Sequence, residues 1–341
     1  MLLQLIRRLL PWLPPEVPEA AHAPYFSRAL NETPEQHSFR LNETEMLIVH
    51  WAQVHADWRD GRRTGPVTKG LPVWDGESLN GKTVLLHDWP GLGDSLNFVR
   101  YANDLKALGA TVLLEVRPEA ASLLSRVAGV DGAVTSAMEC SFDFHVPGAT
   151  LLLYSMLNHL QASAVLGVAE PYLAPLQSKV QDWSARLSPL RRPRIGLSWA
   201  GNPGNRNDAI RSIPLSALSP VIASAQGALV SLQVGAAAQQ LDSLGVVAPI
   251  LNLSSDLNDL EDTAAVIQHL DLVISVDSTV AHLAGGMGKP VWLLRSVGAD
   301  RRWDVAVHPH HWYRGFVIYA TQRPGDWSDT LAKVAGDIKR F

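Results

Sequence analysis

Short apolar segments alternate with amphipathic helical segments along most of this chain, and no other feature constrains its fold as strongly. Strand-like runs at Thr83–Trp89 and Thr111–Val116 are each followed by a segment with helical spacing, and Phe142–Val146 adds a further strand. Strands that alternate with helices of about ten to fifteen residues are typical of parallel βαβ units. The first half of the chain therefore predicts a Rossmann-like α/β domain.

The same alternation begins again near residue 194, after a proline-bounded segment over 175–193 that is predicted to link two halves. Residues 1–73 form an N-terminal extension, and the expected domains cover residues 74–180 and 181–326. A closing helix over 327–341 is expected to pack back on the first domain. The strands predicted for the second domain are Arg194–Trp199, Ala228–Gln233, Pro249–Leu253, Asp271–Val276 and Pro290–Leu294.

Composition excludes several classes of protein. A length of 341 residues suits two domains, and a net charge of −4 argues against nucleic acid as the main partner. The single cysteine, Cys140, excludes an internal disulfide and fits a reducing, cytoplasmic compartment. No apolar run reaches the roughly 20 residues that a membrane-spanning helix needs.

The first 14 residues have the pattern of an amphipathic helix, with leucines on one face and Arg7 and Arg8 on the other. Two interpretations fit this pattern. The helix packs on its own domain, or it docks the protein to the inner membrane surface or to a protein partner.

In open parallel sheets, ligands bind at the carboxyl ends of strands, where loops lead into helices. The first such junction is Pro90–Asp94, where Gly93 lets the backbone approach a ligand closely. Asp94 stands where the next helix begins, which is also the favoured place for a simple N-cap. The junction lacks the third glycine of a dinucleotide-binding fingerprint.

The second junction, Val276–His282, carries the strongest functional signal. Ser278 and Thr279 open a helix after a buried strand, and their hydroxyls and free N–H groups suit a pyrophosphate. Asp277 cannot favour the same phosphate, so a sugar hydroxyl is its expected partner. His282 lies one turn into the helix, where a lone histidine is usually structural.

The third junction is a loop rich in glycine and asparagine that follows the strand ending at Trp199. Gly201 and Asn202 can wrap phosphates, and Arg206 and Arg211 supply charge-assisted contacts. The alternative is a solvated loop whose arginines have no special role.

No metal site is expected. His308, His310 and His311 look like a metal cluster, but no nearby Cys, Asp or Glu except Asp304 keeps regular ligand spacing, so surface histidines are the better interpretation. The sequence contains no Asp-x-Asp pair, the usual device that holds a nucleotide-sugar through a divalent cation, and no P-loop.

Taken in order, these junctions resemble the GT-B glycosyltransferases of the lipopolysaccharide heptosyltransferase family, and most closely the bacterial branch often fused to tetratricopeptide repeats. No 34-residue repeat is found in residues 1–70. The similarity covers about residues 74–327. Its pieces are Trp74–Lys82, Gly91–Asp94, Gly196–Pro203, Arg211–Leu215, Val230–Gln233, Asp262–Ala265, Val276–Ala284 and Gly288–Leu294.

This resemblance implies two Rossmann-like domains facing a cleft, the first for the acceptor and the second for the donor. It implies inverting, metal-independent transfer of a sugar from a nucleotide-sugar, with no cofactor, to a glycan, lipid or protein hydroxyl. Asp94 matches the family's proposed general base, Arg211 the basic residue on the donor diphosphate, and Asp277 the aspartate on the donor sugar. Ser278 and Thr279 match the diphosphate contacts, and His282 matches a following histidine. Gln233 and the region 259–262 match ribose and base contacts.

Two other functions stay open from the sequence. One is a GT-B sugar-nucleotide epimerase or a phosphorylase. An epimerase typically needs more carboxylates and histidines in the cleft than this sequence offers. The other is a module that binds a nucleotide-sugar without turnover. The motifs do not identify the sugar of the donor, and they are equally compatible with ADP, GDP or UDP as its nucleotide.

Overall fold

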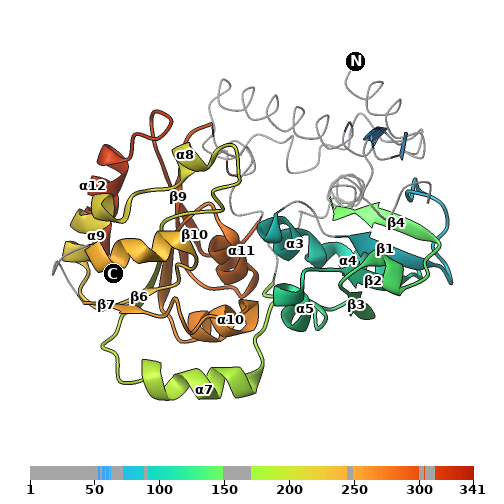
Figure 1. The fold of residues 1–341 in the computed structure, drawn as a ribbon, viewed down its shortest axis with the longest axis horizontal. Coiled ribbons are helices and arrows are strands. Elements are labelled where there is room, and N and C mark those ends of the chain that lie inside the picture. Colours follow the sequence, from blue (N-terminus) through green and yellow to red (C-terminus); the bar gives the residue numbers. More distant parts are fainter. Residues whose placement is uncertain are drawn as a thin grey trace, which may run out of the picture. The chain divides into compact units, whose positions relative to one another are not determined.

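The structure is a computed structural model, which describes residues 53, 56–57, 59–60, 62, 72–87, 91–148, 170–243, 249–298, 303 and 312–341. The contacts divide the chain into two compact units (Figure 1). One comprises residues 1–169 and 305–311, and the other comprises residues 170–304 and 312–341. The predicted helix over residues 1–14 and the residues Asp304, His308, His310 and His311 lie outside the described part.

The first unit contains a parallel sheet in the order β3-β2-β1-β4. The predicted strands form, and in the central strand β1 Val84, Leu85 and Leu86 are buried because the strand is apolar on both faces. The sequence pattern missed β3, which has only three residues. The strands are β1 (Thr83–His87), β2 (Thr111–Glu115), β3 (Gly132–Val134) and β4 (Phe144–Pro147). The helical segments are α3 (Leu92–Phe98), η1 (Val99–Tyr101), α4 (Ala102–Ala107), α5 (Pro118–Leu124) and η2 (Ala137–Glu139).

The second unit contains a parallel sheet in the order β10-β9-β8-β5-β6-β7. Counted from β5 as the first strand, this is the Rossmann order 3-2-1-4-5-6. The strands are β5 (Arg194–Ser198), β6 (Ala228–Ser231), β7 (Ile250–Asn252), β8 (Leu272–Val276), β9 (Val291–Arg295) and β10 (Phe316–Ala320). The helical segments are α7 (Gln177–Leu187), α8 (Asp208–Arg211), η3 (Leu215–Leu218), α9 (Ser219–Ser224), η4 (Ala236–Ser243), α10 (Leu260–Gln268), α11 (Thr279–Gly286) and α12 (Ser328–Ile338).

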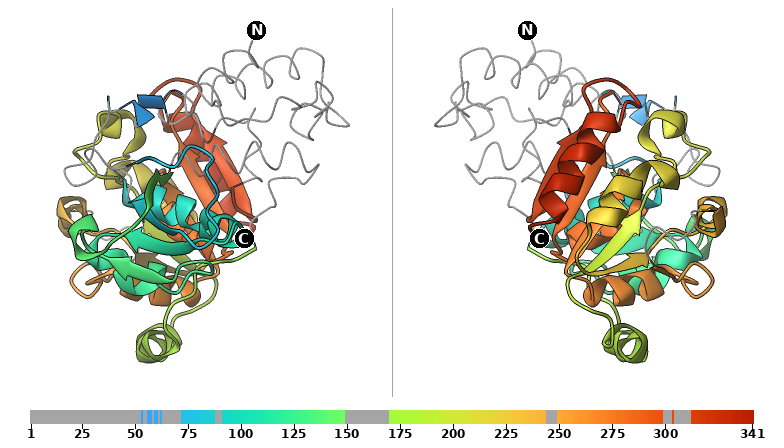
Figure 2. Two further views of the ribbon diagram at one scale, coloured as in Figure 1. Left: turned by 90° about the vertical axis from the view of Figure 1, so that its right-hand side faces the viewer. Right: turned by 90° about the vertical axis from the view of Figure 1, so that its left-hand side faces the viewer.

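Helix α12 belongs to the second unit, so the expectation that residues 327–341 pack back on the first domain is wrong. α12 packs against α9, and the two lie side by side in Figure 2. Its apolar face, which includes Leu331, Val334 and Ile338, joins the core formed by β5, β8 and β9. The prediction failed because an amphipathic pattern shows that a helix buries one face, but not which sheet it covers.

The segment expected to link the halves is also part of the second unit. Residues 177–187 form α7, which packs on α10, and the boundary expected at residue 180 falls inside this helix. Lys179 Nζ lies 2.8 Å from Asp262 Oδ1, and the buried Trp183 donates to the same oxygen at 3.4 Å. These contacts fix α7 to the helix that it covers.

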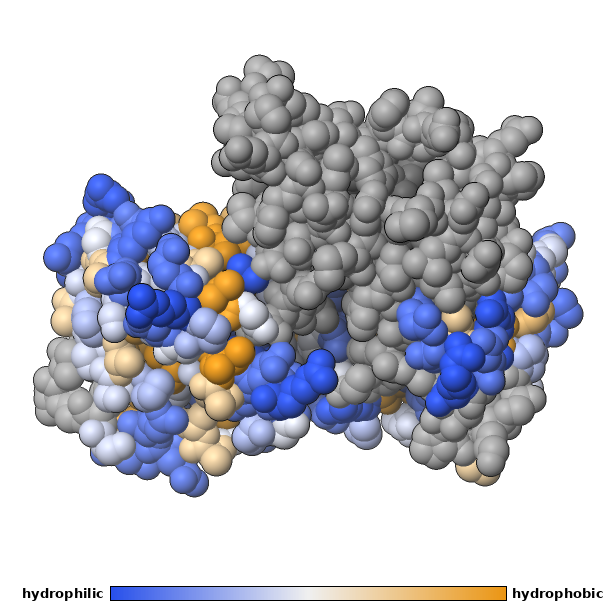
Figure 3. Space-filling model, turned by 90° about the horizontal axis from the view of Figure 1, so that it is seen from above, coloured by the Kyte–Doolittle hydropathy of each residue, from blue (hydrophilic) through white to orange (hydrophobic). Residues whose placement is uncertain are grey.

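The described surface seen in Figure 3 is mainly hydrophilic, with apolar patches on the second unit. Val317 and Phe341 are exposed apolar side chains of the second unit. Within the described residues, no helix has the length and apolar character to cross a bilayer.

The packing of α12 can be tested by truncating its buried face. Leu331→Ala should lower the free energy of unfolding by about 2–5 kcal/mol, because it removes a buried leucine and leaves a cavity. Lys339→Ala, at the exposed end of the helix, should change it by less than about 0.5 kcal/mol. Urea unfolding followed by circular dichroism measures both, and equal effects would contradict the assigned packing.

Candidate functional site

The order in which the chain adds strands to the second sheet reverses between β5 and β8. After β5 the chain builds β6 and β7 on one side, and it then crosses over to add β8, β9 and β10 on the other. β5 and β8 pair directly, with Ser198 opposite Ser275 at their carboxyl ends. Such a switch point is where open α/β sheets bind ligands. The two junctions singled out in this half of the sequence follow these two strands.

Arg211 connects the two junctions. Its Nη1 donates to the backbone carbonyl of Asp277 at 3.2 Å, its Nη2 to that of Asn202 at 3.4 Å, and its Nε to Asp208 Oδ1 at 3.1 Å. Three contacts from three segments hold a side chain that is 12% exposed. A guanidinium has five N–H donors, so this geometry fixes the cation while leaving it donors for an anion.

Gly201 makes room for this guanidinium. A Cβ atom built on Gly201 would lie 2.3 Å from Nη2 and 2.5 Å from Cζ of Arg211, so any side chain at this position displaces the cation. The Gly201 N–H donates to Ser212 Oγ at 3.0 Å, which holds the loop against the start of the next segment. The sequence pattern placed Gly201 in a phosphate loop, and the structure adds its steric role toward Arg211.

The other loop residues are not brought into this cluster. Asn202 is exposed, and its side chain accepts from the Gly204 N–H at 2.9 Å in a local turn. Arg206 is exposed and has no hydrogen bond or ion pair with any described residue. Of the two arginines singled out, only Arg211 is therefore held in place by the fold.

The junction after β8 presents the start of helix α11. Ser278 is its N-cap, and the Ser278 hydroxyl lies 2.9 Å from Ser275 Oγ instead of capping the helix. Thr279 is the first helical residue and is partly exposed. The first N–H groups of a helix have no partner within it and carry partial positive charge. These N–H groups and the guanidinium of Arg211, which donates to the Asp277 carbonyl, form an electropositive site.

Asp277 and His282 are buried side by side. His282 Nε2 lies 3.9 Å from Asp277 Oδ1, and His282 Nδ1 is hydrogen-bonded to the Tyr313 hydroxyl at 2.8 Å. The imidazole also packs beside Trp303, with 5.2 Å between ring centroids. Sequence reasoning missed Tyr313 because it lies 31 residues away in a stretch without periodicity.

Gln233 fixes the loops that follow β5 and β6. Its Oε1 accepts from the backbone N–H groups of Trp199 at 3.0 Å and Ala200 at 2.9 Å. Its Nε2 donates to the carbonyls of Ala200 and Val234, both at 3.2 Å. Because both ends of this buried amide have partners within the protein, the structure gives Gln233 a structural role in addition to the ligand contact predicted for it.

The region 259–262 also has internal partners. Asp259 is the N-cap of α10 and accepts from the Asp262 N–H at 2.8 Å. Burial acts to raise the pKa of Asp262, but hydrogen bonds from Lys179 and from Asn258 outweigh it and hold the pKa below its usual value. These carboxylates therefore stabilise the packing of α7 and α10.

In the first unit, Asp94 lies at the carboxyl end of β1 but does not cap the following helix. Gly91 is the N-cap of α3, Gly93 is the second helical residue and Asp94 is the third. The interpretation of Asp94 as an N-cap is thus wrong, because the helix begins one turn earlier than the pattern indicated. A Cβ atom on Gly91 would lie 2.8 Å from Asp94 Oδ2, so the missing side chain at Gly91 leaves room for this carboxylate.

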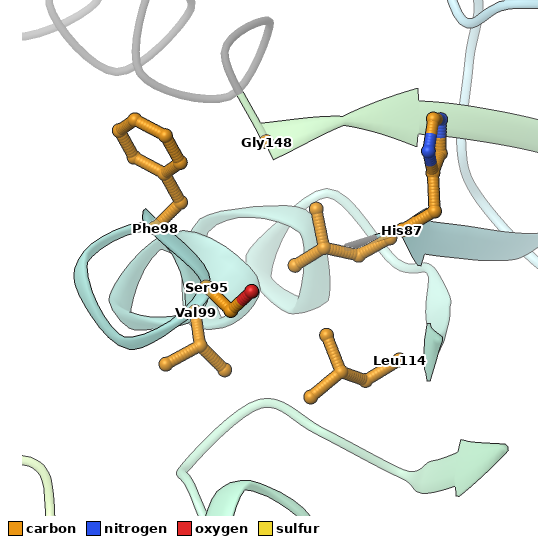
Figure 4. A pocket seen from close by; sticks show the side chains of 7 residues that line it. His87, Ser95, Phe98, Val99, Leu114 and Gly148 are labelled. Carbon is orange, nitrogen blue, oxygen red and sulfur yellow. The ribbon is translucent and has the colours of Figure 1, made fainter. Parts of the chain in front are cut away.

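A buried histidine pair lies at the matching switch point of the first sheet, between β1 and β4. His87 Nε2 is 3.0 Å from His145 Nδ1. Burial first, and the neighbouring His145 second, lower the pKa of His87 to about 3. His87 also lines a small apolar pocket with Leu86, Ser95, Phe98, Val99, Leu114 and Gly148, into which the Ser95 hydroxyl points (Figure 4).

The buried His87 predicts a specific loss of stability in acid. The unfolded chain binds a proton at His87 near pH 6.5 and the folded protein only near pH 3, so this contribution is complete above pH 6.5 and decreases as the pH falls. At pH 5 the loss amounts to about 2 kcal/mol.

Chemical unfolding at pH 7.5 and pH 5 measures this loss. His87→Gln should be less stable at pH 7.5 but should lose less on acidification than the wild type. An unchanged pH dependence in the variant would assign the acid sensitivity to other groups.

Comparisons with known sequences match part of the second unit to a protein family and the chain to a known relative. Residues 223–294 match the model of the family described as Glycosyltransferase family 9 (heptosyltransferase). Protein FlbA of Caulobacter vibrioides is 25% identical over 288 residues, which cover 79% of this chain and 48% of FlbA. The chain thus spans about half the length of that relative.

The chain was also compared with solved structures. The glycosyltransferase family 9 protein from Veillonella parvula has a TM-score of 0.56 at 11% identity, over 77% of this chain and 99% of that one. The ADP-heptose lipopolysaccharide heptosyltransferase II of E. coli has a TM-score of 0.49 at 15% identity, over 75% of this chain and 99% of that one. The predicted α/β fold with two parallel sheets of the GT-B type is confirmed by the first of these. The sequence of the second unit is thus similar to glycosyltransferase family 9 (heptosyltransferase) over residues 223–294, and the chain shares its fold with the family 9 protein from Veillonella parvula.

Proposed function

We propose that this protein is an inverting, metal-independent glycosyltransferase that moves a sugar from a nucleotide-sugar to an acceptor hydroxyl. The observation that carries the proposal is the anchoring of Arg211 on the Asp277 carbonyl, at the switch point of the second sheet and beside the start of α11. A cation and unpaired helical N–H groups at one strand edge suit a diphosphate. The acceptor is a hydroxyl of a bacterial glycan, lipid or protein.

In this proposal the second unit binds the donor. Arg211 and the N–H groups at Thr279 hold the diphosphate, while the Asp277 carboxylate accepts a hydrogen bond from a hydroxyl of the donor sugar. ADP-sugars are the first donors to test, because the E. coli relative of similar fold is an ADP-heptose enzyme. The finer placement in the branch often fused to tetratricopeptide repeats rests on the sequence motifs alone.

The proposed reaction is a single displacement. Asp94 takes the proton from the acceptor hydroxyl, whose oxygen forms a bond to the anomeric carbon as the bond from that carbon to the diphosphate oxygen breaks. Attack from the face opposite the diphosphate inverts the anomeric configuration. Arg211 and the helix start stabilise the negative charge that develops on the leaving diphosphate.

Removing the anchored cation should weaken donor binding. Arg211→Ala should lower the affinity for the donor about ten- to hundredfold, as expected when charged hydrogen bonds are lost. Gly201→Ala should have a similar effect because its methyl group displaces the guanidinium. Arg340→Ala, at an exposed residue just after the end of α12, is the control and should bind as the wild type does.

Thermal shift against ADP-, GDP-, UDP- and CMP-sugars first identifies the donor, since a ligand at 100 times its Kd adds about 2.7 kcal/mol. Calorimetry on the variants then gives their affinities. If both Arg211→Ala and Gly201→Ala bind the donor with the affinity of the wild type, the donor site lies elsewhere.

Replacing the proposed base should separate chemistry from folding. Asp94→Asn should lower turnover about 10²–10⁴-fold, because an amide cannot accept the acceptor's proton. Asp94 is not the N-cap, so the variant should keep the start of the helix and lose the favourable charge in its first turn, which contributes about 0.3–1 kcal/mol. Steady-state transfer, donor affinity and melting temperature are measured together. Turnover within a few-fold of the wild type would remove Asp94 from the mechanism.

Activity should not require a divalent cation, because the proposal assigns the leaving-group charge to Arg211 and to helical N–H groups. Sugar transfer measured in excess EDTA should equal that in buffer. A loss that magnesium or manganese restores would show that a cation takes part. Donor binding with neither transfer nor hydrolysis would instead indicate a binding module.

A further inference from the structure

One carboxylate oxygen in the short helix α8 binds two side chains of the segment that follows β5. Oδ1 of Asp208, the first residue of α8, accepts from Nε of Arg211 at 3.1 Å and from the Ser212 hydroxyl at 2.9 Å. The Asp208 side chain is 18% exposed and that of Arg211 is 12% exposed, so most of the solvent is kept from their contact. Two side chains of this segment thus meet on a residue that the sequence motifs did not single out.

The direction of each hydrogen bond in this group follows from its atoms. The backbone N–H of Gly201 can only donate, and it donates to Ser212 Oγ at 3.0 Å. Nε of Arg211 can likewise only donate, and a carboxylate can only accept. The Ser212 hydroxyl, whose oxygen accepts from Gly201, therefore uses its own proton for Asp208 Oδ1. Through Ser212 the Asp208 carboxylate is thus fixed to the first part of the loop.

The loop itself is closed at its base. The Ile213 N–H donates to the Trp199 carbonyl at 2.8 Å, and both residues are buried. The Trp199 N–H in turn donates to Gln233 Oε1 at 3.0 Å. The two ends of the loop therefore have fixed positions relative to β5, and so does the carboxylate that is bound there.

The contact with Asp208 decides which N–H groups of Arg211 are left for a ligand. Nε donates to Asp208, one N–H of Nη1 donates to the Asp277 carbonyl at 3.2 Å, and one of Nη2 to the Asn202 carbonyl at 3.4 Å. Because a guanidinium has five N–H groups, one remains on each terminal nitrogen. The contact with Asp208 is the shortest of the three and joins opposite charges, which strengthens a hydrogen bond.

We propose that Asp208 is a positioning residue for the donor diphosphate, which acts by holding the guanidinium of Arg211. The inference rests on the proposed function, in which Arg211 binds that diphosphate. An unrestrained arginine side chain samples many rotamers, and ordering it on binding weakens the affinity. Asp208 orders it before the donor binds. The carboxylate also repels a diphosphate, so the benefit of Asp208 lies in its position as an acceptor and not in its charge.

Two substitutions that remove the same charge test the proposal. Asp208→Asn keeps the Oδ1 acceptor and Asp208→Ala removes it, while the loss of repulsion is common to both. Asp208→Ala should therefore bind a nucleoside diphosphate about three- to tenfold more weakly than Asp208→Asn, the effect of one lost hydrogen bond. Calorimetry with ADP, GDP and UDP gives the affinities, and the variants are compared with the one that the wild type binds most tightly. Equal affinities of the two variants would overturn the proposal.

The same pair of substitutions at Asp329 is the control. Asp329 is an exposed acidic residue in the first turn of α12, in the same unit. Asp329→Asn and Asp329→Ala should bind the nucleoside diphosphate equally. A difference as large as that at Asp208 would show that the effect does not depend on the contact with Arg211, and the proposal would be wrong.

A second background shows whether the effect passes through Arg211. In Arg211→Ala no guanidinium is left to position, so adding Asp208→Asn or Asp208→Ala should give affinities within about twofold of each other. If the two differ as much as they do in the presence of Arg211, Asp208 acts on the loop or on the ligand directly, and the proposal is overturned.

Arg211→Ala by itself separates this inference from the proposed donor site. If the wild type binds none of the three nucleoside diphosphates, or if Arg211→Ala binds them as the wild type does, the donor site and the role of Asp208 are both wrong. If Arg211→Ala binds weakly while Asp208→Asn and Asp208→Ala bind alike, only the role of Asp208 is wrong.

Discussion

The parallel pairing of strands is the constraint on which the chemistry of both units depends. Because every pair in each sheet is parallel, all carboxyl ends lie at one edge, and the loops that follow them converge there. The order of strands then selects one place along this edge. In the second sheet that place lies between β5 and β8, and in the first it lies between β1 and β4. Arg211 and Asp277 lie near the place in the second sheet, and Asp94 and His87 lie near the place in the first.

Buried polar side chains stabilise the loops at these edges. Gln233 ties the loop after β5 to the one after β6, and Arg211 ties it to the end of β8. The loops thereby have a fixed shape before any ligand is present, which lowers the entropy that binding must offset. Two glycines complete the arrangement, since Gly201 and Gly91 are the places where a Cβ atom would displace Arg211 and Asp94. The contacts of Arg211 thus hold both the loop after β5 and the guanidinium itself in place.

Prediction succeeded where a signal is local. The strands Thr83–His87 and Leu272–Val276 follow from uninterrupted apolar runs, because a strand buried on both faces needs no polar residues. It missed β10, although Phe316–Ala320 is itself an apolar run, and it assigned the helical segment that forms α7 to a linker. The cap assigned to Asp94 failed because the residue that begins a helix depends on backbone geometry as well as on residue type.

For the site, the sequence by itself identified the junctions and most of the residue types, because glycines, hydroxyls and charges after buried strands form a local pattern. It also determined the family resemblance, which residues 223–294 bear out. Only the tertiary structure decided which of these residues meet. Arg211 contacts Asp277, which is 66 residues away in the sequence, and Tyr313 contacts His282, which is 31 residues away. Arg206, in contrast, lies on an exposed loop. Such contacts depend on strand order and on side-chain reach across the sheet, and neither is encoded in the spacing of residues along the chain.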